Sequence, residues 1–225
     1  MNEPLKNLYN EVLITKLSLY ITTIYKEFDQ QTFSRAIFDT DWESKELKQR
    51  MRHITECLHQ YLPPDYQSAL DILKPVATKF NGFEYMLFPY FVELYGLHDW
   101  QNSLPALAHF TKYSSSEFAV RPFIVQDEQR MMQQMAKWAE DKNHHIRRLA
   151  SESCRPRLPW AMALVNFKKD PSPIIPILEQ LKQDPSEYVR RSVANNLNDI
   201  SKDHPDLILQ LSKKWIGNNK QADCK

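Results

Sequence analysis

The segments WAEDKNHHIRRLASES (138–153) and LKQDPSEYVRRSVANN (181–196) are two copies of one pattern, 43 residues apart. The matched pairs are Asp141 with Asp184, Ile146 with Val189, Arg147 with Arg190 and Arg148 with Arg191. A fainter third copy, SSSEFAVRPFI (114–124), has one extra residue before its Val-Arg pair. The second half of the chain is therefore built from repeats.

A repeat of this length with two helices is typical of HEAT and armadillo arrays. One such unit cannot bury its apolar face alone, so neighbouring units stack into a curved solenoid with a concave surface. We therefore expect an all-α, HEAT-like α-solenoid over residues 1–225, a single domain with a concave basic face. In this interpretation residues 1–110 form a less regular helical cap, and residues 111–225 form the repeats that carry the functional site.

Residues 1–110 also show helical periodicity. Apolar residues recur at spacings of three and four between positions 13 and 24, and again between positions 47 and 62. Pro89 predicts a short or kinked helix within 83–95. The segment 103–107 predicts the capped start of another helix, with Pro105 near its first turn.

Composition argues against several classes of protein. The chain has 225 residues, of which 42% are hydrophobic, so it is not a disordered chain. It contains 3 Gly and neither a GxGxxG nor a GxxxxGKS/T motif, so a nucleotide-binding loop is not indicated. The 7 His include no HExxH motif, and we expect neither a metal nor a cofactor.

The start of the chain does not resemble a signal peptide, and no apolar run is long enough to span a membrane. The 3 Cys are widely spaced, which argues against a disulfide framework and favours a reducing compartment. We therefore expect a cytoplasmic protein that does not bind membranes. We also expect a monomer.

Charge is divided unequally along the chain. Residues 111–225 carry 19 Lys and Arg against 14 Asp and Glu, whereas residues 1–110 carry 10 against 14. The basic half is the half that contains the repeats. This distribution favours a polyanionic partner for the repeats.

The segment SEYVRRSVANNLNDISKDHPD (186–206) predicts a helix with an unusual polar stripe. The stripe recurs at spacings of four, four and three residues: Arg191, Asn195, Asp199 and Lys202. The apolar stripe of the same helix consists of Val189, Val193, Leu197 and Ile200. Because Asn is a weaker helix former than the Glu and Lys of an ordinary solvated helix, we interpret the polar stripe as a recognition surface.

The other copies carry related side chains: Arg148 and Glu152, then Arg155, Arg157 and Trp160 after the copy at 138–153, and Glu117 with Arg121 in the copy at 114–124. If the repeats superpose, Glu117, Glu152 and Asp199 converge on one concave face beside a row of arginines. The planar guanidinium of arginine bonds phosphate oxygens bidentately. A row of arginines spaced by repeat stacking would follow a nucleic-acid backbone.

Structural roles are the alternative for these residues. HEAT repeats commonly carry an Asp and an Arg that bridge one repeat to the next, which would make Asp184 and Arg190 or Arg191 structural. Arg–Glu pairs four residues apart on a helix contribute only a few tenths of a kcal/mol. The functional alternative for the carboxylates is a cationic target, such as a sugar with oxocarbenium character or an alkylated base. The ring of Trp160 would face that target or would belong to the core.

Three segments together are specific: SSSEFAVRPF (114–123), HIRRLASESCRPRLPWA (145–161) and SEYVRRSVANNLNDISKDHPD (186–206). They resemble the signature segments of the AlkC branch of the HEAT-like alkylpurine DNA glycosylases, as do EPLKNLYN (3–10) and ELKQRM (46–51). The family usually has Gly where Ser153 stands. Its pattern also continues through at least one more basic repeat and, in some members, an immunoglobulin-like domain.

The resemblance implies a bacterial base-excision repair enzyme that hydrolyses the N-glycosidic bond of N3-methyladenine and similar cationic bases in duplex DNA. It implies catalytic roles for Glu117, Glu152 and Asp199, and lesion contacts for Trp160 and Asn195. The implied DNA-binding residues are Arg121, Arg147, Arg148, Arg155, Arg157, Arg190, Arg191 and Lys202. The same resemblance implies water as the nucleophile, without a metal or cofactor.

Two other functions stay open at this level. One is a HEAT-repeat protein that recognises DNA structure without excising a base, and the other is a HEAT scaffold that binds an acidic protein partner. Salt-dependent duplex binding separates the scaffold from the two DNA-binding functions. Release of a free base separates the glycosylase from the non-catalytic DNA binder.

Overall fold

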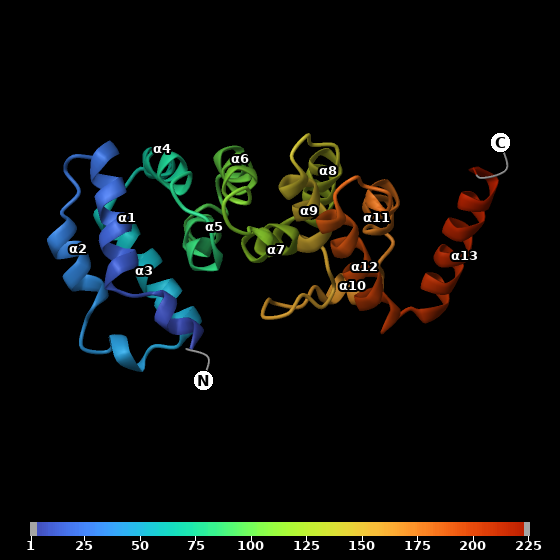
Figure 1. Cartoon of the computed structure of the whole chain (residues 1–225), viewed down its shortest axis with the longest axis horizontal. Coiled ribbons are helices and arrows are strands. Elements are labelled where there is room, and N and C mark those ends of the chain that lie inside the picture. The colour runs from blue at the N-terminus through green and yellow to red at the C-terminus, as the bar shows by residue number, and fades with distance from the viewer. Residues whose placement is uncertain (1–3, 223–225) are drawn as a thin grey trace. The chain divides into compact units, whose positions relative to one another are not determined.

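The computed structural model describes residues 4–222, with side chains as far as Ile216, and within this range the regular elements are helices (Figure 1). The predicted all-α class is confirmed for these residues. Packing divides the chain into two compact units, residues 1–122 and 123–225. The boundary between these units lies inside helix α7 (Glu117–Gln126).

The first unit contains six helices before α7, with short 3-10 turns between some of them. The helices are α1 (Glu11–Ile24), α2 (Gln30–Ile37), α3 (Leu47–Tyr61), α4 (Tyr66–Ala77), α5 (Leu87–Tyr95) and α6 (Trp100–Phe110). The 3-10 turns are η1 (Leu5–Leu8), η2 (Trp42–Ser44) and η3 (Phe83–Met86).

Short polar side chains set the starts of several of these helices. The carboxylate of Asp65 accepts a hydrogen bond from the backbone N–H of Ser68 at 2.8 Å and so caps α4. The segment 83–95 is divided into η3 and α5, with Pro89 in the first turn of α5, as its proline predicts. The prediction for Pro105 was wrong, because α6 begins at Trp100 behind the cap Asp99 and contains Pro105 in its interior.

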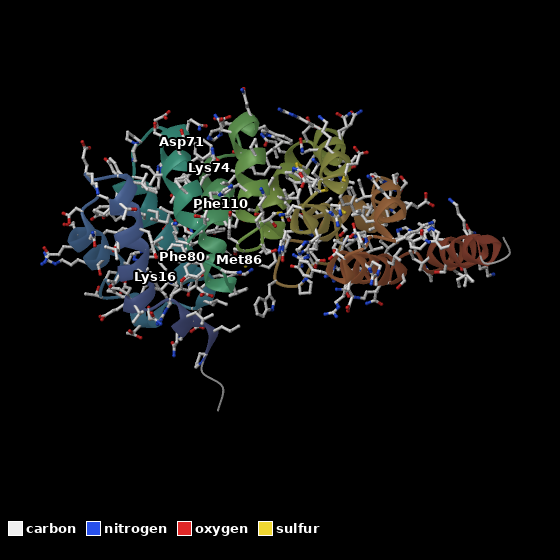
Figure 2. All side chains as sticks on the ribbon, turned by 45° about the horizontal axis from the view of Figure 1, so that its top comes forward. Lys16, Asp71, Lys74, Phe80, Met86 and Phe110 are labelled. Atoms are coloured by element: carbon white, nitrogen blue, oxygen red, sulfur yellow. The ribbon has the colours of Figure 1, made fainter. Side chains whose placement is uncertain are left out.

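The interior of the first unit is rich in aromatic rings. Phe80 and Tyr85 stack with their ring centroids 4.4 Å apart, and Phe88 stacks on Phe110 at 5.7 Å. Lys16 lies over the ring of Phe80, 5.2 Å from its centroid (Figure 2). Non-directional burial of large rings therefore stabilises much of this unit.

The second unit contains the end of α7 and six further helices. They are α8 (Glu128–Ala139), α9 (His144–Ser153), α10 (Val165–Lys169), α11 (Ile175–Leu181), α12 (Glu187–Ser201) and α13 (Pro205–Ala222). Helices α9 and α12 pack directly on each other. Their contacts advance together along both helices, from Ser151 with Ser192 to Arg155 with Asp199, so the two helices run parallel.

The repeat of 43 residues is visible in the hydrogen bonds of this unit. The first arginine of each Arg-Arg pair closes its own preceding turn: Arg147 donates to the carbonyls of Asp141 and Lys142, and Arg190 donates to those of Asp184 and Pro185. The carboxylates of Asp141 and Asp184 likewise cap equivalent backbone N–H groups, those of Asn143 and Ser186. Residues 43 apart therefore make the same local contacts.

One of these arginines also connects the two copies. The guanidinium of Arg147 donates to the carboxylate of Asp184 through Nε at 2.5 Å and through Nη2 at 2.8 Å. Arg147 holds the pKa of Asp184 below its usual value, mainly through these hydrogen bonds. The inter-repeat bridge anticipated for Asp184 exists, but its partner is Arg147 of the preceding copy rather than the side chain of Arg190 or Arg191.

Candidate functional site

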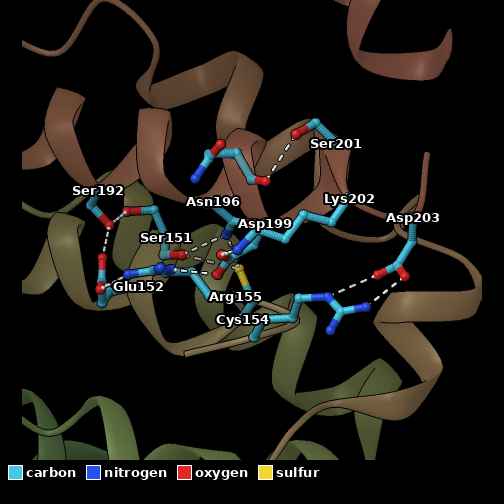
Figure 3. Close-up of polar contacts among 12 residues, drawn as sticks. Ser151, Glu152, Cys154, Arg155, Ser192, Asn196, Asp199, Ser201, Lys202 and Asp203 are labelled. Atoms are coloured by element: carbon cyan, nitrogen blue, oxygen red, sulfur yellow. Dashed lines mark hydrogen bonds and ion pairs between the residues drawn. The ribbon is translucent and has the colours of Figure 1, made fainter. Parts of the chain in front are cut away.

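A cluster of buried ionic groups lies between α9 and α12, beside the loop of residues 154–164 that follows α9 (Figure 3). Glu152, at the end of α9, is 4% exposed. Its Oε1 atom pairs with Arg155 Nη1 at 2.7 Å and with Arg148 Nη2 at 3.3 Å. Its Oε2 atom accepts a hydrogen bond of 2.6 Å from the hydroxyl of Ser192 on α12.

The second carboxylate of the cluster is Asp199, which is 2% exposed on α12. Arg155 donates to it from Nε at 2.9 Å, and Lys202 pairs with its other oxygen at 3.3 Å. Arg155 therefore bridges Glu152 and Asp199 with two different nitrogens. Burial lowers the pKa of Arg155, but its hydrogen bonds to Asp199 and Glu152 outweigh that effect and leave the pKa above its usual value.

The cluster is rich in positive charge. Two carboxylates, Glu152 and Asp199, are paired with three cations, Arg148, Arg155 and Lys202. Each carboxylate oxygen has a donor or cation within 3.3 Å. Such pairing offsets the repulsion between the carboxylates and a polyanion.

The helix α12 presents a different, exposed polar face. Arg190, Arg191, Asn195 and Lys202 are exposed, while the predicted apolar positions Val189, Val193 and Ile200 are buried. Arg191 pairs with Glu187 four residues earlier, at 2.7 Å, and its side chain is 70% exposed. The guanidinium of Arg191 is therefore accessible to a ligand.

Trp160, in the loop after α9, has an unusual backbone conformation and an exposed side chain. Its backbone φ is +64°, in the left-handed region that side chains other than glycine seldom adopt, and the residue is 59% exposed. A bulky residue in this conformation is strained, and such strain concentrates at functional sites. The fold therefore maintains an unfavourable backbone geometry that presents an indole ring to solvent.

Arg157 in the same loop bonds bidentately to Asp203, through Nε at 3.1 Å and Nη2 at 2.7 Å. These hydrogen bonds lower the pKa of Asp203 and raise that of Arg157. The pair ties the loop that carries Trp160 to the segment after α12. Within the described residues, no group of three or more His, Cys, Asp or Glu side chains is placed to hold a metal ion.

The chain is similar in sequence and in fold to known proteins. Residues 111–222 match the family model described as DNA alkylation repair enzyme. The chain belongs to this family. It is 40% identical to the Pseudomonas fluorescens alkylpurine DNA glycosylase AlkC, whose structure was solved bound to DNA containing an abasic site analog. That structural match has a TM-score of 0.91 and covers 95% of this chain and 59% of AlkC.

A second relative of this chain is the uncharacterized protein YhaZ of Bacillus subtilis strain 168, which is 49% identical over 219 residues. The match covers 97% of this chain and 61% of YhaZ. The chain thus spans about three fifths of the length of both relatives. The likeness to AlkC confirms the predicted HEAT-like helical-repeat fold.

The structure brings some of the predicted site residues together and leaves others apart. Glu152, Asp199 and Arg155 form one cluster, and Arg148 and Lys202 border it. Glu117, at the start of α7, belongs to the first unit, so its convergence with Glu152 and Asp199 stays a prediction.

Two arginines that were predicted to contact phosphate are engaged within the protein or buried in this structure. Arg121 is fully buried in the first unit and therefore lacks the exposed guanidinium that a phosphate contact requires. Arg147 has its guanidinium occupied by Asp184 and by two carbonyl groups. Their contacts with DNA phosphates stay predictions.

Two buried residues of α12, Ser192 and Asn196, were missed because sequence periodicity assigns that face to the core. Ser192 and Asn196 are buried against α9 and bond to Glu152 and to the Ser151 carbonyl. Asp199 was expected on an exposed stripe and lies on this buried face. The spacing of 192, 196 and 199 was the available signal, since three polar residues at intervals of four and three share one side of a helix.

Proposed function

We propose that this chain carries the catalytic and DNA-binding region of a glycosylase that excises cationic alkylated bases, N3-methyladenine among them, from duplex DNA. The observation that carries the proposal is the pair of carboxylates, Glu152 and Asp199, joined by Arg155. The family and the likeness to AlkC support the same reaction. We propose that the protein acts as a monomer on nucleoid DNA.

The proposed reaction is hydrolysis of the bond between the sugar C1′ and the base nitrogen. The bonding electron pair leaves with the base, which was positively charged and departs neutral, so no proton needs to be delivered to it. The sugar then develops oxocarbenium character, which a nearby carboxylate stabilises. Water adds to C1′ and loses a proton, and the DNA is left with an abasic site.

The pairing of the carboxylates matters for this reaction. A free carboxylate beside DNA would repel the phosphates in the ground state. Glu152 and Asp199 instead share cations, so the cluster as a whole does not oppose a polyanion. Electrostatic groups held in place before the reaction stabilise developing charge without reorganisation.

The remaining proposed contacts lie around this cluster. Arg191, Asn195 and Lys202 on the exposed face of α12 would contact DNA phosphates and the lesion. The ring of Trp160 would face the cationic base or sugar through a cation–π contact. Its exposure and strained backbone support a contact with a ligand rather than a place in the core.

The decisive experiment measures single-turnover release of 3-methyladenine from methylated duplex DNA by the wild-type chain and by Glu152→Gln. We expect the variant to lose about 10²- to 10³-fold in rate, because it lacks the charge that stabilises the transition state. Its duplex affinity should be equal or better. A folded Glu152→Gln variant that releases base at the wild-type rate would make Glu152 a structural partner of Arg148 and Arg155.

A second function is favoured by one observation. Both carboxylates are almost fully buried and saturated by protein donors, as expected for a purely structural network in a DNA-binding HEAT protein that does not excise a base. Under that alternative the wild-type chain binds duplex DNA with strong salt dependence and releases no free base. A HEAT scaffold for an acidic protein would show no salt-dependent duplex binding.

A further inference from the structure

Ser192 occupies a position where the repeat has an apolar residue. At the offset of 43 residues it corresponds to Leu149, which is fully buried in α9. Ser192 is 2% exposed, so a hydroxyl replaces a core side chain at the contact between α9 and α12. A buried hydroxyl disfavours folding unless it is hydrogen-bonded, and here its partners lie in the candidate site.

The hydroxyl of Ser192 has two short contacts. It donates to Glu152 Oε2 at 2.6 Å and lies 2.6 Å from the hydroxyl of Ser151. Because a hydroxyl carries one hydrogen and the carboxylate of Glu152 can only accept, the hydrogen of Ser192 points to Glu152. The hydroxyl of Ser151 also donates to the carbonyl of Arg148 at 3.1 Å, and Asn196 Nδ2 donates to the carbonyl of Ser151 at 2.8 Å.

This donor differs from the others that reach Glu152. Arg148 and Arg155 have long, flexible side chains, lie close to Glu152 in the chain, and both contact Oε1. Ser192 has a short side chain with one rotatable bond to its oxygen, comes from α12, and contacts Oε2. It therefore fixes the plane of the carboxylate relative to the helix whose outer face carries Arg191 and Asn195.

We propose that Ser192 is a positioning residue of the glycosylase, which orients the carboxylate of Glu152 toward the lesion sugar while α12 contacts the DNA. The proposal rests on the proposed function. Without this hydrogen bond, Glu152 keeps its charge and its arginine partners but rotates about its terminal bond. The loss falls on the transition state, because the orientation of the carboxylate matters most when the sugar becomes cationic.

The test compares Ser192→Ala with the wild-type chain in single-turnover base release and in duplex binding. We expect the rate to fall about tenfold or more, as for a lost hydrogen bond to a charged group. The dissociation constant for duplex should stay within about twofold, because Ser192 is buried and does not contact phosphate. Ser192→Thr keeps the hydroxyl and should recover most of the rate.

Two controls separate positioning from packing. Ser151→Ala removes a buried hydroxyl from the same helix pair without touching the carboxylate, so its loss of rate should be smaller than that of Ser192→Ala. Ser103→Ala removes a buried hydroxyl from the first unit and should leave the rate unchanged. Circular dichroism and thermal unfolding check that all the variants fold.

Two outcomes would overturn the proposal. One is a folded Ser192→Ala variant with the wild-type rate; the other is a rate that falls equally in Ser192→Ala, Ser192→Thr and Ser151→Ala, as a packing defect would produce. If the wild-type chain itself releases no base, the proposed function fails and the role of Ser192 fails with it. Base release by the wild-type chain therefore distinguishes the two failures.

Discussion

The two units of the chain differ in the contacts described between their helices. The first unit packs rings on rings, such as Phe88 on Phe110, whereas the second joins α9 to α12 through ion pairs and hydroxyls. Aromatic burial contributes stability with little demand on direction. Buried ion pairs contribute little net stability compared with apolar groups of the same size, but their loss is costly when one partner is removed. The interface between α9 and α12 in the second unit therefore contains groups of fixed charge and direction where apolar side chains would contribute more stability.

The difference indicates where function constrains the chain. The candidate site, the strained Trp160 and the exposed basic face all belong to the unit with the ionic interface. Perturbed and paired ionisable groups concentrate at functional sites more often than at structural ones. Four measurements test this contrast, from the largest expected effect to the smallest.

The largest effect is expected from Arg147→Met, which leaves the carboxylate of Asp184 buried without its main partner. We expect the second unit to lose about 3–5 kcal/mol of stability. The backbone amides of the helices in the first unit should keep their wild-type protection from hydrogen exchange. Hydrogen exchange of α9 and α12, compared with α3 and α5, measures the loss in each unit.

The stability of a double variant and the pH dependence of stability test the same ion pair further. Arg147→Met with Asp184→Asn removes the buried charge and should recover part of the lost stability. Because Arg147 lowers the pKa of Asp184, the stability from this pair is complete above the ordinary value of 3.8 and is lost as pH falls through the lower folded value. If the Arg147→Met variant loses the same stability as the wild-type chain when the pH falls, the loss does not come from the pair of Arg147 and Asp184.

The first unit should respond to pH in the opposite sense. Burial raises the pKa of Glu93 on α5 from 4.5 to about 7. Its contribution to stability is complete below 4.5 and is lost as pH rises through about 7, because the folded state disfavours the charged form. We expect Glu93→Gln to stabilise the first unit at pH 8 by up to about 3 kcal/mol.

Denaturant unfolding of wild-type and Glu93→Gln protein at roughly pH 4 and pH 8 measures this effect. The two proteins should be similar at the lower pH and should differ at the higher one. Base release should not change, since Glu93 lies outside the candidate site. Equal stability at both pH values would mean that Glu93 is as well solvated in the folded chain as in the unfolded chain.

Trp160→Asn tests the strain in the second unit. Asn adopts the left-handed conformation more readily, so we expect a gain of about 1 kcal/mol in thermal stability. We also expect base release to fall about tenfold, because the aromatic face is lost. Trp160→Phe keeps both the strain and a ring, and should change each quantity less. A Trp160→Asn variant of unchanged activity would remove Trp160 from the site.

The smallest effect on stability is expected from Arg191→Ala, because Arg191 is exposed and its pair with Glu187 lies on the surface. Stability should change by less than about 0.5 kcal/mol. The salt dependence of duplex binding should lose about one unit of slope for one lost phosphate contact. Lys79→Ala, at an exposed position of the first unit, is the matched control. Equal changes in slope for both variants would extend the DNA-binding surface to the first unit.

The amino-acid sequence alone determined the helical class and the repeat. The period of 43 residues is visible because each copy must cap the same turn with Asp and close it with Arg, and these contacts are local. The short helix within 83–95 was predictable for the same reason, since the missing N–H of Pro89 acts within one turn.

Only the tertiary structure decided which charges are accessible. Periodicity places Asp199 on a polar stripe with Arg191 and Asn195, yet Arg155 reaches across from the end of α9 and covers it. Likewise, Arg147 meets Asp184 only because the next repeat stacks beside it. Contacts between segments some 40 residues apart depend on how the helices pack. The spacing of hydrophobic residues within one helix does not indicate which polar groups a neighbouring helix places beside it.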